Sequence, residues 1–398
     1  MVLLIALPFV ITVITINAEQ VMCQEAQDTK PSPSSGVFLM AKMNNFRFHV
    51  VGLPHTQVTL DYTSCAFTER VRKFCVMMKD VLGHKVYLYA GEQTDAPCDE
   101  LITCISEEDR RQAVGDQHFV HASFDASLDH WKRFNWRAAG AIKARAEPHD
   151  FVCVIGGNCH KPIADDLPHM MTVEFSIGYG GTFSPYRVWE SYAWMHTCLG
   201  AQAGNPNATD GRFFDAVIPG SFDPADFPFR AEKDDYYFYI GRLTERKGFK
   251  IAADVCRRIG KRLLIAGQGD APEYGEYLGV VGPEERGQIL AGAKAIFVPT
   301  IYIEPFGNVA VEAQLCGTPV ITVPWGAMTE TVENGKTGYH CHTLQDFMDA
   351  SDNVDGLDPH YIHDRAVAKY SYEVIAQKYQ RHFERLSTLW GDGWYTTA

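Results

Sequence analysis

Two glutamates in the C-terminal third of the chain, Glu304 and Glu312, lie eight positions apart in the stretch EPFGNVAVEAQLCG. A helix is expected to begin near Asn308, which places Glu304 in the preceding loop and Glu312 within the helix. The first turn of a helix presents unpaired N–H groups and a partial positive charge, and Gly307 allows a ligand to come close. One interpretation is an anion site flanked by two acids that accept hydrogen bonds from sugar hydroxyls. In the other, Glu312 is a solvated helix position and Glu304 an ordinary loop charge.

Two cations follow a predicted strand in the stretch YYFYIGRLTERKGFK. Gly241 turns the chain at the strand end, and Arg242 and Lys247 bracket the turn that follows. Open parallel sheets bind ligands at the carboxyl ends of their strands, where Arg offers a planar fork to phosphate oxygens and Lys a point charge. A phosphate site is one interpretation, and surface charge on an ordinary loop is the alternative. Gly267, after the next strand, would let the backbone approach a ligand, although such turns use glycine routinely.

Four candidates in the N-terminal half also follow predicted strands and would lie on the cleft side: His55, His160, Glu174 and Tyr179. A lone histidine is more often structural than catalytic, so both histidines keep that alternative. The aromatic-rich stretch FSPYRVWESYAWMH could be a sugar-stacking surface or ordinary core packing.

The elements that must position these residues alternate between strand-like and helix-like segments. FRFHVVGL, HKVYLYAG, DFVCVIGG and MMTVEFS have the pattern of strands, and FTERVRKFCVMMKDVLG places apolar residues on one helix face. After the Pro-, Gly- and Asp-rich stretch DAVIPGSFDPADFPFRAEKDD the alternation restarts with the strands YYFYIGRL, RLLIAGQG, YLGVVG, AIFVPT and PVITVPW. The pattern predicts an α/β protein with two Rossmann-like, doubly wound parallel sheets that face each other across a cleft.

The composition limits the classes of function. The chain has 398 residues, of which 46% are hydrophobic and 21% charged, and this suits two globular domains. The net charge of −13 argues against a nucleic-acid-binding protein, because no basic excess is available to meet phosphates. The 11 cysteines form no Cys-x-x-Cys pair. Buried free thiols in a reducing compartment therefore explain them better than a disulfide framework or a zinc site.

The N-terminal run MVLLIALPFVITVITINA has the length of a signal peptide but lacks a positively charged start. The polar stretch that follows it, up to residue 44, has the composition of a disordered linker. Two hypotheses stay open. Residues 1–44 carry an export or anchoring signal, or the functional start is Met40 or Met43. The rest of the chain favours a cytoplasmic protein, whereas a real signal would imply secretion or a membrane anchor.

The combination of motifs resembles the retaining glycosyltransferases of family 4, which have the GT-B fold. The likeness is carried by the two glutamates with PFG after the first, by GRLTERKG upstream, and by GTPVI and GAMTETVENGKTG downstream. These motifs follow the expected order from Tyr236 to Tyr339. The N-terminal half is similar to a bacterial-type subset through PHTQ, GHKVYLYAGE, VEFSIGYGGTF, RVWESYAWMH and DAVIPGSFDP. The segment ahead of the first strand has no counterpart in the family.

The resemblance implies a role for each charged residue. Arg242 and Lys247 would stabilise the leaving diphosphate, and Glu312 would hold the donor ribose. Glu304 would clamp the transferred sugar together with backbone amides that follow it. The chain departs from the common family pattern in one respect, since no histidine clearly matches the one that many members place near the reacting sugar.

The resemblance also implies backbone contacts to the donor. The amides of Phe306 and Gly307 would act with Glu304, and Val281 and Gly282 would lie near the nucleotide base. The implied donor-binding positions are Glu312, Phe306, Gly307, Asn308, Gly241, Gly267, Val281 and Gly282.

The resemblance suggests a division of the chain into parts. Residues 45–222 would form an acceptor-side domain and residues 223–370 a nucleotide-sugar-binding domain. Residues 371–398 would form a C-terminal helix that packs back toward the N-terminal domain. Residues 1–44 would stay outside the functional domains.

Transfer from a nucleotide sugar needs stabilisation of charge on the departing diphosphate, by a metal or by fixed cations. No two aspartates have the Asp-x-Asp spacing of metal-dependent transferases. Metal-independent transfer with no cofactor is therefore expected, with retention implied by the resemblance. The partners would be a nucleotide sugar and a glycan, lipid or small-molecule acceptor, with peripheral membrane contact through the acceptor and the oligomeric state left open. A nucleotide-sugar epimerase, or a non-catalytic nucleotide-sugar-binding protein on the same scaffold, is the alternative.

Overall fold

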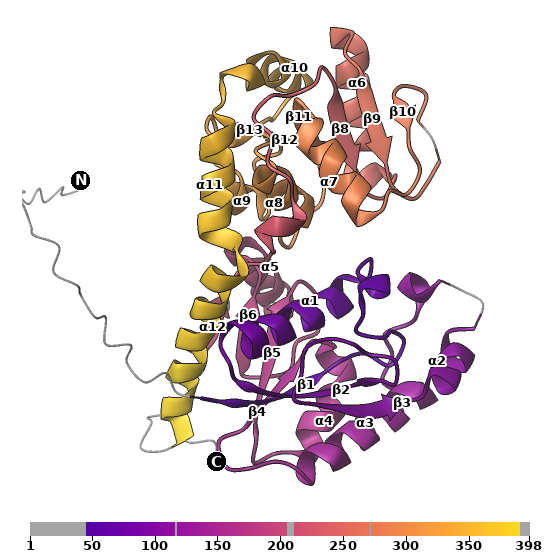
Figure 1. Cartoon of the computed structure of the whole chain (residues 1–398), viewed down its shortest axis with the longest axis vertical. Helices are drawn as coiled ribbons and strands as arrows, with labels where there is room; N and C mark the ends of the chain where they lie inside the picture. The colour runs from indigo at the N-terminus through magenta and orange to yellow at the C-terminus, as the bar shows by residue number, and fades with distance from the viewer. Residues whose placement is uncertain (1–44, 116–117, 205–210, 271, 391–398) are drawn as a thin grey trace, which may run out of the picture. The chain divides into compact units, whose positions relative to one another are not determined.

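The computed structural model describes residues 45–115, 118–204, 211–270 and 272–390 (Figure 1). Residues 1–44, on which the signal hypothesis rests, lie outside the described residues. The strands are β1 (Arg47–Val51), β2 (Lys85–Gly91), β3 (Glu100–Ile105), β4 (Phe151–Val154), β5 (Met171–Ile177), β6 (Tyr186–Trp189), β7 (Asp215–Val217), β8 (Tyr237–Ile240), β9 (Leu263–Ala266), β10 (Glu276–Tyr277), β11 (Ala295–Val298), β12 (Val320–Thr322) and β13 (Gly338–His340). The α-helices are α1 (Ala66–Cys75), α2 (Glu107–Val114), α3 (Asp129–Lys143), α4 (Lys161–Asp166), α5 (Tyr192–Ala203), α6 (Phe249–Ile259), α7 (Pro283–Gly292), α8 (Asn308–Leu315), α9 (Met328–Thr331), α10 (Leu344–Asn353), α11 (Pro359–Tyr370) and α12 (Tyr372–Ser387).

The N-terminal sheet has the strand order β3-β2-β1-β4-β5-β6-β7, and every neighbouring pair is parallel. Alternation along β1 feeds two cores, since Phe48 and Val50 face one side of the sheet and Val51 the other. The first core is closed by α1 and α12 and the second by α3 and α4. Figure 1 shows these helix pairs on opposite sides of the sheet.

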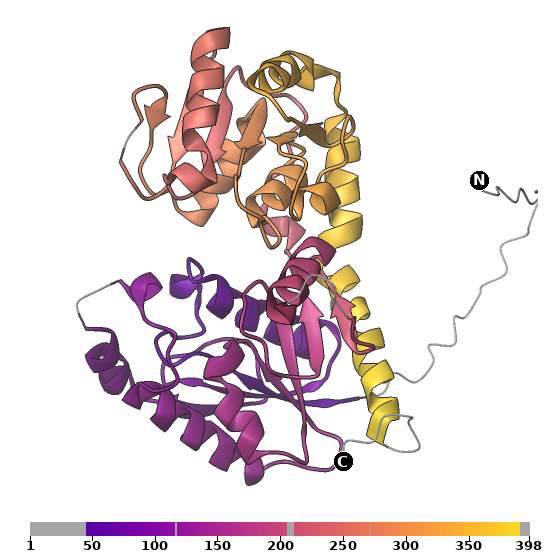
Figure 2. The same ribbon diagram turned by 180° about the vertical axis from the view of Figure 1, so that it is seen from behind.

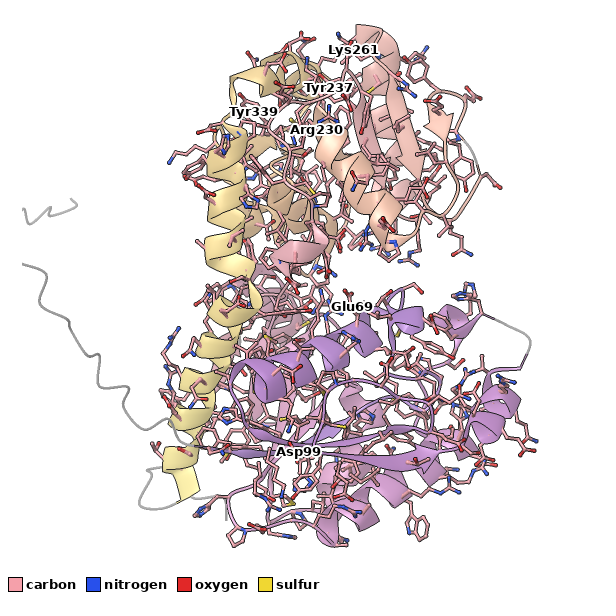
Figure 3. The ribbon with its side chains drawn as sticks, viewed as in Figure 1. Glu69, Asp99, Arg230, Tyr237, Lys261 and Tyr339 are labelled. Carbon is pink, nitrogen blue, oxygen red and sulfur yellow. The ribbon has the colours of Figure 1, made fainter. Side chains whose placement is uncertain are left out.

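The C-terminal sheet has the order β10-β9-β8-β11-β12-β13, again with all pairs parallel. Strands β8, β9 and β11 at its centre are continuous apolar or aromatic runs, as expected for a sheet covered on both faces. Helix α6 packs with α10, and α7 packs with α8. Tyr237 of β8, labelled in Figure 3, lies within this core and donates its hydroxyl to the Ser351 carbonyl at 2.7 Å. The predicted α/β architecture of two parallel-sheet domains is confirmed.

The chain passes between the domains twice, at positions that pair with each other. Phe222 and Ser371 form an isolated parallel bridge, in which the Tyr372 amide donates to the Phe222 carbonyl at 3.1 Å. Helix α12 then packs on the N-terminal sheet, with the Phe383 ring centroid 4.6 Å from that of Phe48 (Figure 2).

The structure differs from the expected strand YLGVVG. Strand β10 contains only Glu276 and Tyr277. The Gly279 carbonyl still accepts from the Gly267 amide at 2.7 Å, and Gly279, with φ +73°, then turns the chain. Val280 is consequently exposed to 76%. In the aromatic-rich stretch FSPYRVWESYAWMH, Tyr186 and Trp189 of β6 are buried. For these two residues the interpretation as core packing therefore holds. Over the described part of the chain, no helix combines the length and apolar character needed to cross a membrane.

Candidate active site

A cavity of about 730 Å³ lies at the carboxyl ends of β8 and β11 and is lined from both domains. The C-terminal domain contributes the candidate residues Gly241, Arg242, Lys247, Glu304, Phe306, Gly307 and Asn308. The N-terminal domain contributes Ala66, Phe67 and Arg70 of α1, and Gly178 after β5. Four of the predicted donor-binding positions, Glu312, Gly267, Val281 and Gly282, lie outside this lining and are described separately below.

The turn after β8 is held close to the turn after β9. The Gly241 amide donates to the Ala266 carbonyl at 3.1 Å. Gly267 has φ +136°, and a Cβ atom there would lie 1.9 Å from the Gly241 carbonyl oxygen. The close approach therefore needs glycine at position 267. It fixes the path of the chain into Arg242, whose exposed side chain lines the cavity.

Lys247 is positioned by a similarly tight turn. It ends a 3-10 turn, Glu245–Lys247, and Gly248 follows with φ +76°. A Cβ atom at Gly248 would lie 2.1 Å from the Pro299 carbonyl oxygen, so this turn is pressed against the end of β11. The Lys247 ammonium reaches across to Glu304, with Nζ 2.7 Å from Oε2.

Glu304 is held through both its backbone and its side chain. Its carbonyl accepts a hydrogen bond from the Ala327 amide at 3.0 Å. Its Oε2 accepts from Lys247 Nζ and, at 2.8 Å, from the Tyr302 hydroxyl. The Glu304 side chain is 15% exposed, so it is more enclosed than an ordinary loop charge.

The start of α8 completes the cavity. Gly307 is the N-cap with φ +82°, and no side chain caps the helix. The first-turn N–H groups at Asn308 and Val309 thus lack a side-chain acceptor, which is the condition for an anion site at a helix start. Phe306 is buried beside Tyr370, with ring centroids 5.9 Å apart, and anchors the turn in the core.

Glu312 lies further along α8 and does not line the cavity. It is only 5% exposed, so the interpretation of a solvated helix position is wrong. Burial raises the pKa of its carboxyl, while Arg286 opposes the rise with Nε 3.5 Å from Oε2. Among the described residues no hydrogen-bond donor reaches that oxygen. A buried carboxylate oxygen without a donor can accept one from a ligand.

Gly267, Val281 and Gly282 also lie outside the cavity lining. Gly267 acts on the site through its close approach to Gly241. Gly282 is the N-cap of α7 and leads into the helix that carries Arg286, the partner of Glu312.

The two histidine candidates are core residues that do not line the cavity. His55 and His160 are 1% and 0% exposed, and both pack on Trp131 with ring centroids 6.2 and 5.4 Å away. Burial lowers the pKa of His55 to about 4 and that of His160 to about 3. Both imidazoles are therefore neutral near pH 7.

Glu174, within β5, and Tyr179, which follows that strand, form a separate group in which Glu174 is buried and Tyr179 half-buried. Glu174 is 0% exposed, and its Oε2 accepts from the amides of Phe183 and Ser184 at 2.9 and 2.8 Å. Burial raises the pKa of this carboxyl to about 7. The Tyr179 hydroxyl donates to its other oxygen at 3.4 Å. Neither residue lines the cavity.

Two side chains in the cavity were not anticipated. Arg70 of α1 forms a bidentate ion pair with the buried Glu190, with Nε 2.5 Å from Oε1. Arg70 and Glu190 are 120 positions apart in the sequence, so no local sequence pattern indicates that they pair. Tyr302 stands two residues before Glu304, and both line the cavity; the spacing of two is the signal in the sequence that could have indicated a shared side.

Metal binding has no ready site in the described ranges, where no group of three His, Cys, Asp or Glu side chains could hold an ion. The ten cysteines in these ranges are free thiols, and all but Cys98 are buried.

Two parallel-sheet domains with a charged cavity at their strand ends define the GT-B class. Solved structures share this fold. AviGT4, a glycosyltransferase involved in avilamycin A biosynthesis, matches with a TM-score of 0.61 at 20% identity, over 86% of this chain and 98% of that one. The sucrose-phosphate synthase of Thermosynechococcus elongatus matches with a TM-score of 0.60 at 16% identity, over 86% and 100%. HepE of Anabaena, in complex with UDP and glucose, matches with a TM-score of 0.58 at 14% identity, over 87% and 100%.

Within that fold, residues 225–357 match the model of the family described as glycosyl transferases group 1. A glycogen synthase of Mycobacterium tuberculosis is 33% identical over 147 residues, which are 31% of this chain and 35% of the relative. A phosphatidyl-myo-inositol mannosyltransferase of the same organism is 27% identical over 207 residues, or 44% and 55%. The chain thus matches between about a third and just over half of the length of these curated relatives.

Proposed function

We propose that this protein is a glycosyltransferase that moves a hexose from a nucleoside-diphosphate sugar to a hydroxyl acceptor. Transfer would proceed with retention of anomeric configuration and without a metal. The observation that carries the proposal is the meeting of Arg242, Lys247, Glu304 and the start of α8 in one cavity. Cations, a helix N-terminus and a hydroxyl-binding acid are the groups that such a donor requires.

The departing diphosphate would be stabilised by Arg242, Lys247 and the first-turn amides of α8. Lysine has three N–H donors, and Glu304 takes one of them, so two are left for phosphate oxygens. Fixed charges of this kind need no reorganisation as negative charge builds up on the leaving group.

The two glutamates would bind hydroxyls rather than exchange protons. Glu304 would hold the transferred sugar. Glu312 would hold the donor ribose through Oε2, the buried oxygen that receives no hydrogen bond from the described residues. The acceptor hydroxyl would attack on the face from which the diphosphate leaves, and no protein nucleophile is assigned. HepE was crystallised with UDP and with UDP-glucose, so UDP-sugars are the first donors to test, with GDP-sugars beside them.

The acceptor is a glycan, lipid or small molecule. The names of the relatives refer to glycogen, to sucrose phosphate and to phosphatidyl-myo-inositol, so they do not narrow this class. A thermal-shift screen of donors comes first, because a ligand that binds only the folded form raises its melting temperature.

The test compares the wild type with Arg242→Ala and a matched control, Arg257→Ala. Arg257 is an exposed arginine of α6 that pairs with Asp254 and lies outside the cavity. With its donor, the wild type should release nucleoside diphosphate slowly without acceptor, and EDTA should not slow it. Arg242→Ala should lose about 10²-fold in kcat, and Arg257→Ala should keep the wild-type rate.

Other outcomes would contradict the proposal. If the sugar of the donor is altered but no nucleoside diphosphate is released, the protein is an epimerase. If the donor binds but is not converted, the protein is a non-catalytic nucleotide-sugar-binding protein. NMR of the product reports the anomeric configuration, and inversion would refute the retaining step.

A further inference from the structure

Tyr302 and Glu304 both face the cavity from the loop after β11. Ile301 and Ile303, which alternate with them, are 57% and 36% exposed, whereas Tyr302 and Glu304 line the cavity. The Ile301 amide donates to the Arg246 carbonyl at 2.9 Å, which ties this loop to the turn that carries Lys247. The alternation therefore places the Tyr302 hydroxyl beside the Glu304 carboxylate.

The two donors to Glu304 converge on one oxygen. Lys247 Nζ lies 2.7 Å and the Tyr302 hydroxyl 2.8 Å from Oε2. No described residue donates a hydrogen bond to Oε1. The carboxylate is thus fixed at one oxygen and open at the other.

The two donors differ in how firmly they are placed. The Tyr302 ring lies beneath two cations, with Lys247 Nζ and the Arg246 guanidinium carbon each 5.0 Å from its centroid. Burial and the neighbouring Glu304 raise the pKa of the Tyr302 hydroxyl, so it remains a donor at any working pH. Lys247, in contrast, is a point charge on a flexible stem.

We propose that Tyr302 is a positioning residue that holds Oε2 of Glu304 and leaves Oε1 to accept a hydroxyl of the transferred sugar. With Tyr302 holding the carboxylate, Lys247 can turn its ammonium to the diphosphate without releasing Glu304. This inference rests on the proposed transferase function and deepens it.

The test replaces only the hydroxyl, with Tyr302→Phe, and uses Tyr236→Phe as the matched control. Tyr236 is a buried tyrosine of the same domain whose hydroxyl donates to the Ile289 carbonyl at 2.8 Å, and it does not line the cavity. Each variant loses one hydrogen bond. The measurements are kcat and donor KM with the donor that the wild type uses, the Kd of the free nucleoside diphosphate by calorimetry, and the melting temperature.

Tyr302→Phe should lower kcat about ten- to hundredfold, because a misplaced clamp acts on the reacting geometry. The donor KM of Tyr302→Phe should stay within about threefold of the wild-type value. Its Kd for the nucleoside diphosphate should match the wild type, because that ligand lacks the transferred sugar. Tyr236→Phe should keep kcat while losing a similar amount of thermal stability.

Two results would overturn the inference while leaving the transferase function intact. One is a kcat of Tyr302→Phe within twofold of Tyr236→Phe. The other is a parallel loss of kcat and nucleoside-diphosphate binding, which would mean that Tyr302 supports the cations and not Glu304. If the wild type turns over no donor, the proposed function fails and the inference falls with it.

Discussion

The approach of Gly267 to Gly241 makes a quantitative prediction for Gly267→Ala. The added Cβ atom would lie 1.9 Å from the Gly241 carbonyl oxygen, about 1.5 Å inside an ordinary contact. That oxygen belongs to backbone and cannot swing aside as a side chain would. The turn that carries Arg242 must therefore move.

Gly260→Ala is the matched control. Gly260 has φ +65°, and nothing lies within 4 Å of its hypothetical Cβ. The control should cost about 1–2 kcal/mol of unfolding free energy, the penalty for an L-residue in the left-handed region. Gly267→Ala should lose a comparable amount of unfolding free energy for the same conformational reason. It should lose about 1–3 kcal/mol more because its Cβ atom overlaps the Gly241 carbonyl, which gives about 2–5 kcal/mol in all.

Chemical denaturation measures the stability, and calorimetry measures the Kd of the nucleoside diphosphate. A shift of about 1 Å at the Arg242 turn should weaken binding at least tenfold in Gly267→Ala and leave it unchanged in Gly260→Ala. Equal stability of the two variants would refute the tight-turn argument. Reduced stability with unchanged binding would show that this turn does not position the donor.

Two further predictions concern the N-terminal domain and its contact with α9. Glu174 has a pKa raised to about 7 from the ordinary 4.5, so the folded state holds an extra proton between these values and stability falls as pH rises through that window. The unfolding free energies of the wild type and Glu174→Gln are measured by chemical denaturation at several pH values. The difference between them should change by about 3 kcal/mol from pH 4.5 to 7. A difference that does not depend on pH would contradict the assignment of Glu174 as a buried acid with a raised pKa. Glu330 accepts from the Tyr192 and Ala193 amides at 3.1 and 2.8 Å, in the first turn of α5. Glu330→Ala should lose about 1 kcal/mol of unfolding free energy, and no loss would mean that this cap is not formed in solution.

The fold was largely predictable from the sequence because its strands are buried on both faces. The β4 and β11 segments, FVCV and AIFV, are continuous apolar runs, and such runs become parallel strands under helices on both sides. YLGVVG is also largely apolar, but its regular strand ends at Tyr277, and Gly279 then turns the chain with φ +73°. Composition alone does not report where a glycine will use its conformational freedom.

The candidate site was predictable where its chemistry is local in sequence. Arg242 and Lys247 follow one strand, and Glu304 precedes one helix, so strand ends and helix starts indicated their place. The ion pair between Lys247 and Glu304 spans 57 positions, and that between Arg70 and Glu190 spans 120. Contacts of that kind depend on register between elements, which one sequence does not specify.

The surroundings of Glu304 show why the sequence motif that contains it does not by itself define the site. Residues Glu304 and Pro305 form hydrogen bonds to several other elements. Lys247 reaches the carboxylate, the Ala327 amide reaches the Glu304 carbonyl, and Ser191 Oγ donates to the Pro305 carbonyl at 2.6 Å. Ser191 belongs to the N-terminal domain and adjoins Glu190, the partner of Arg70. The N-terminal domain therefore helps to set the position of Glu304, the residue proposed to clamp the transferred sugar. A substitution at Ser191 could alter transfer without touching either substrate, so activity changes in that domain need not map the acceptor site.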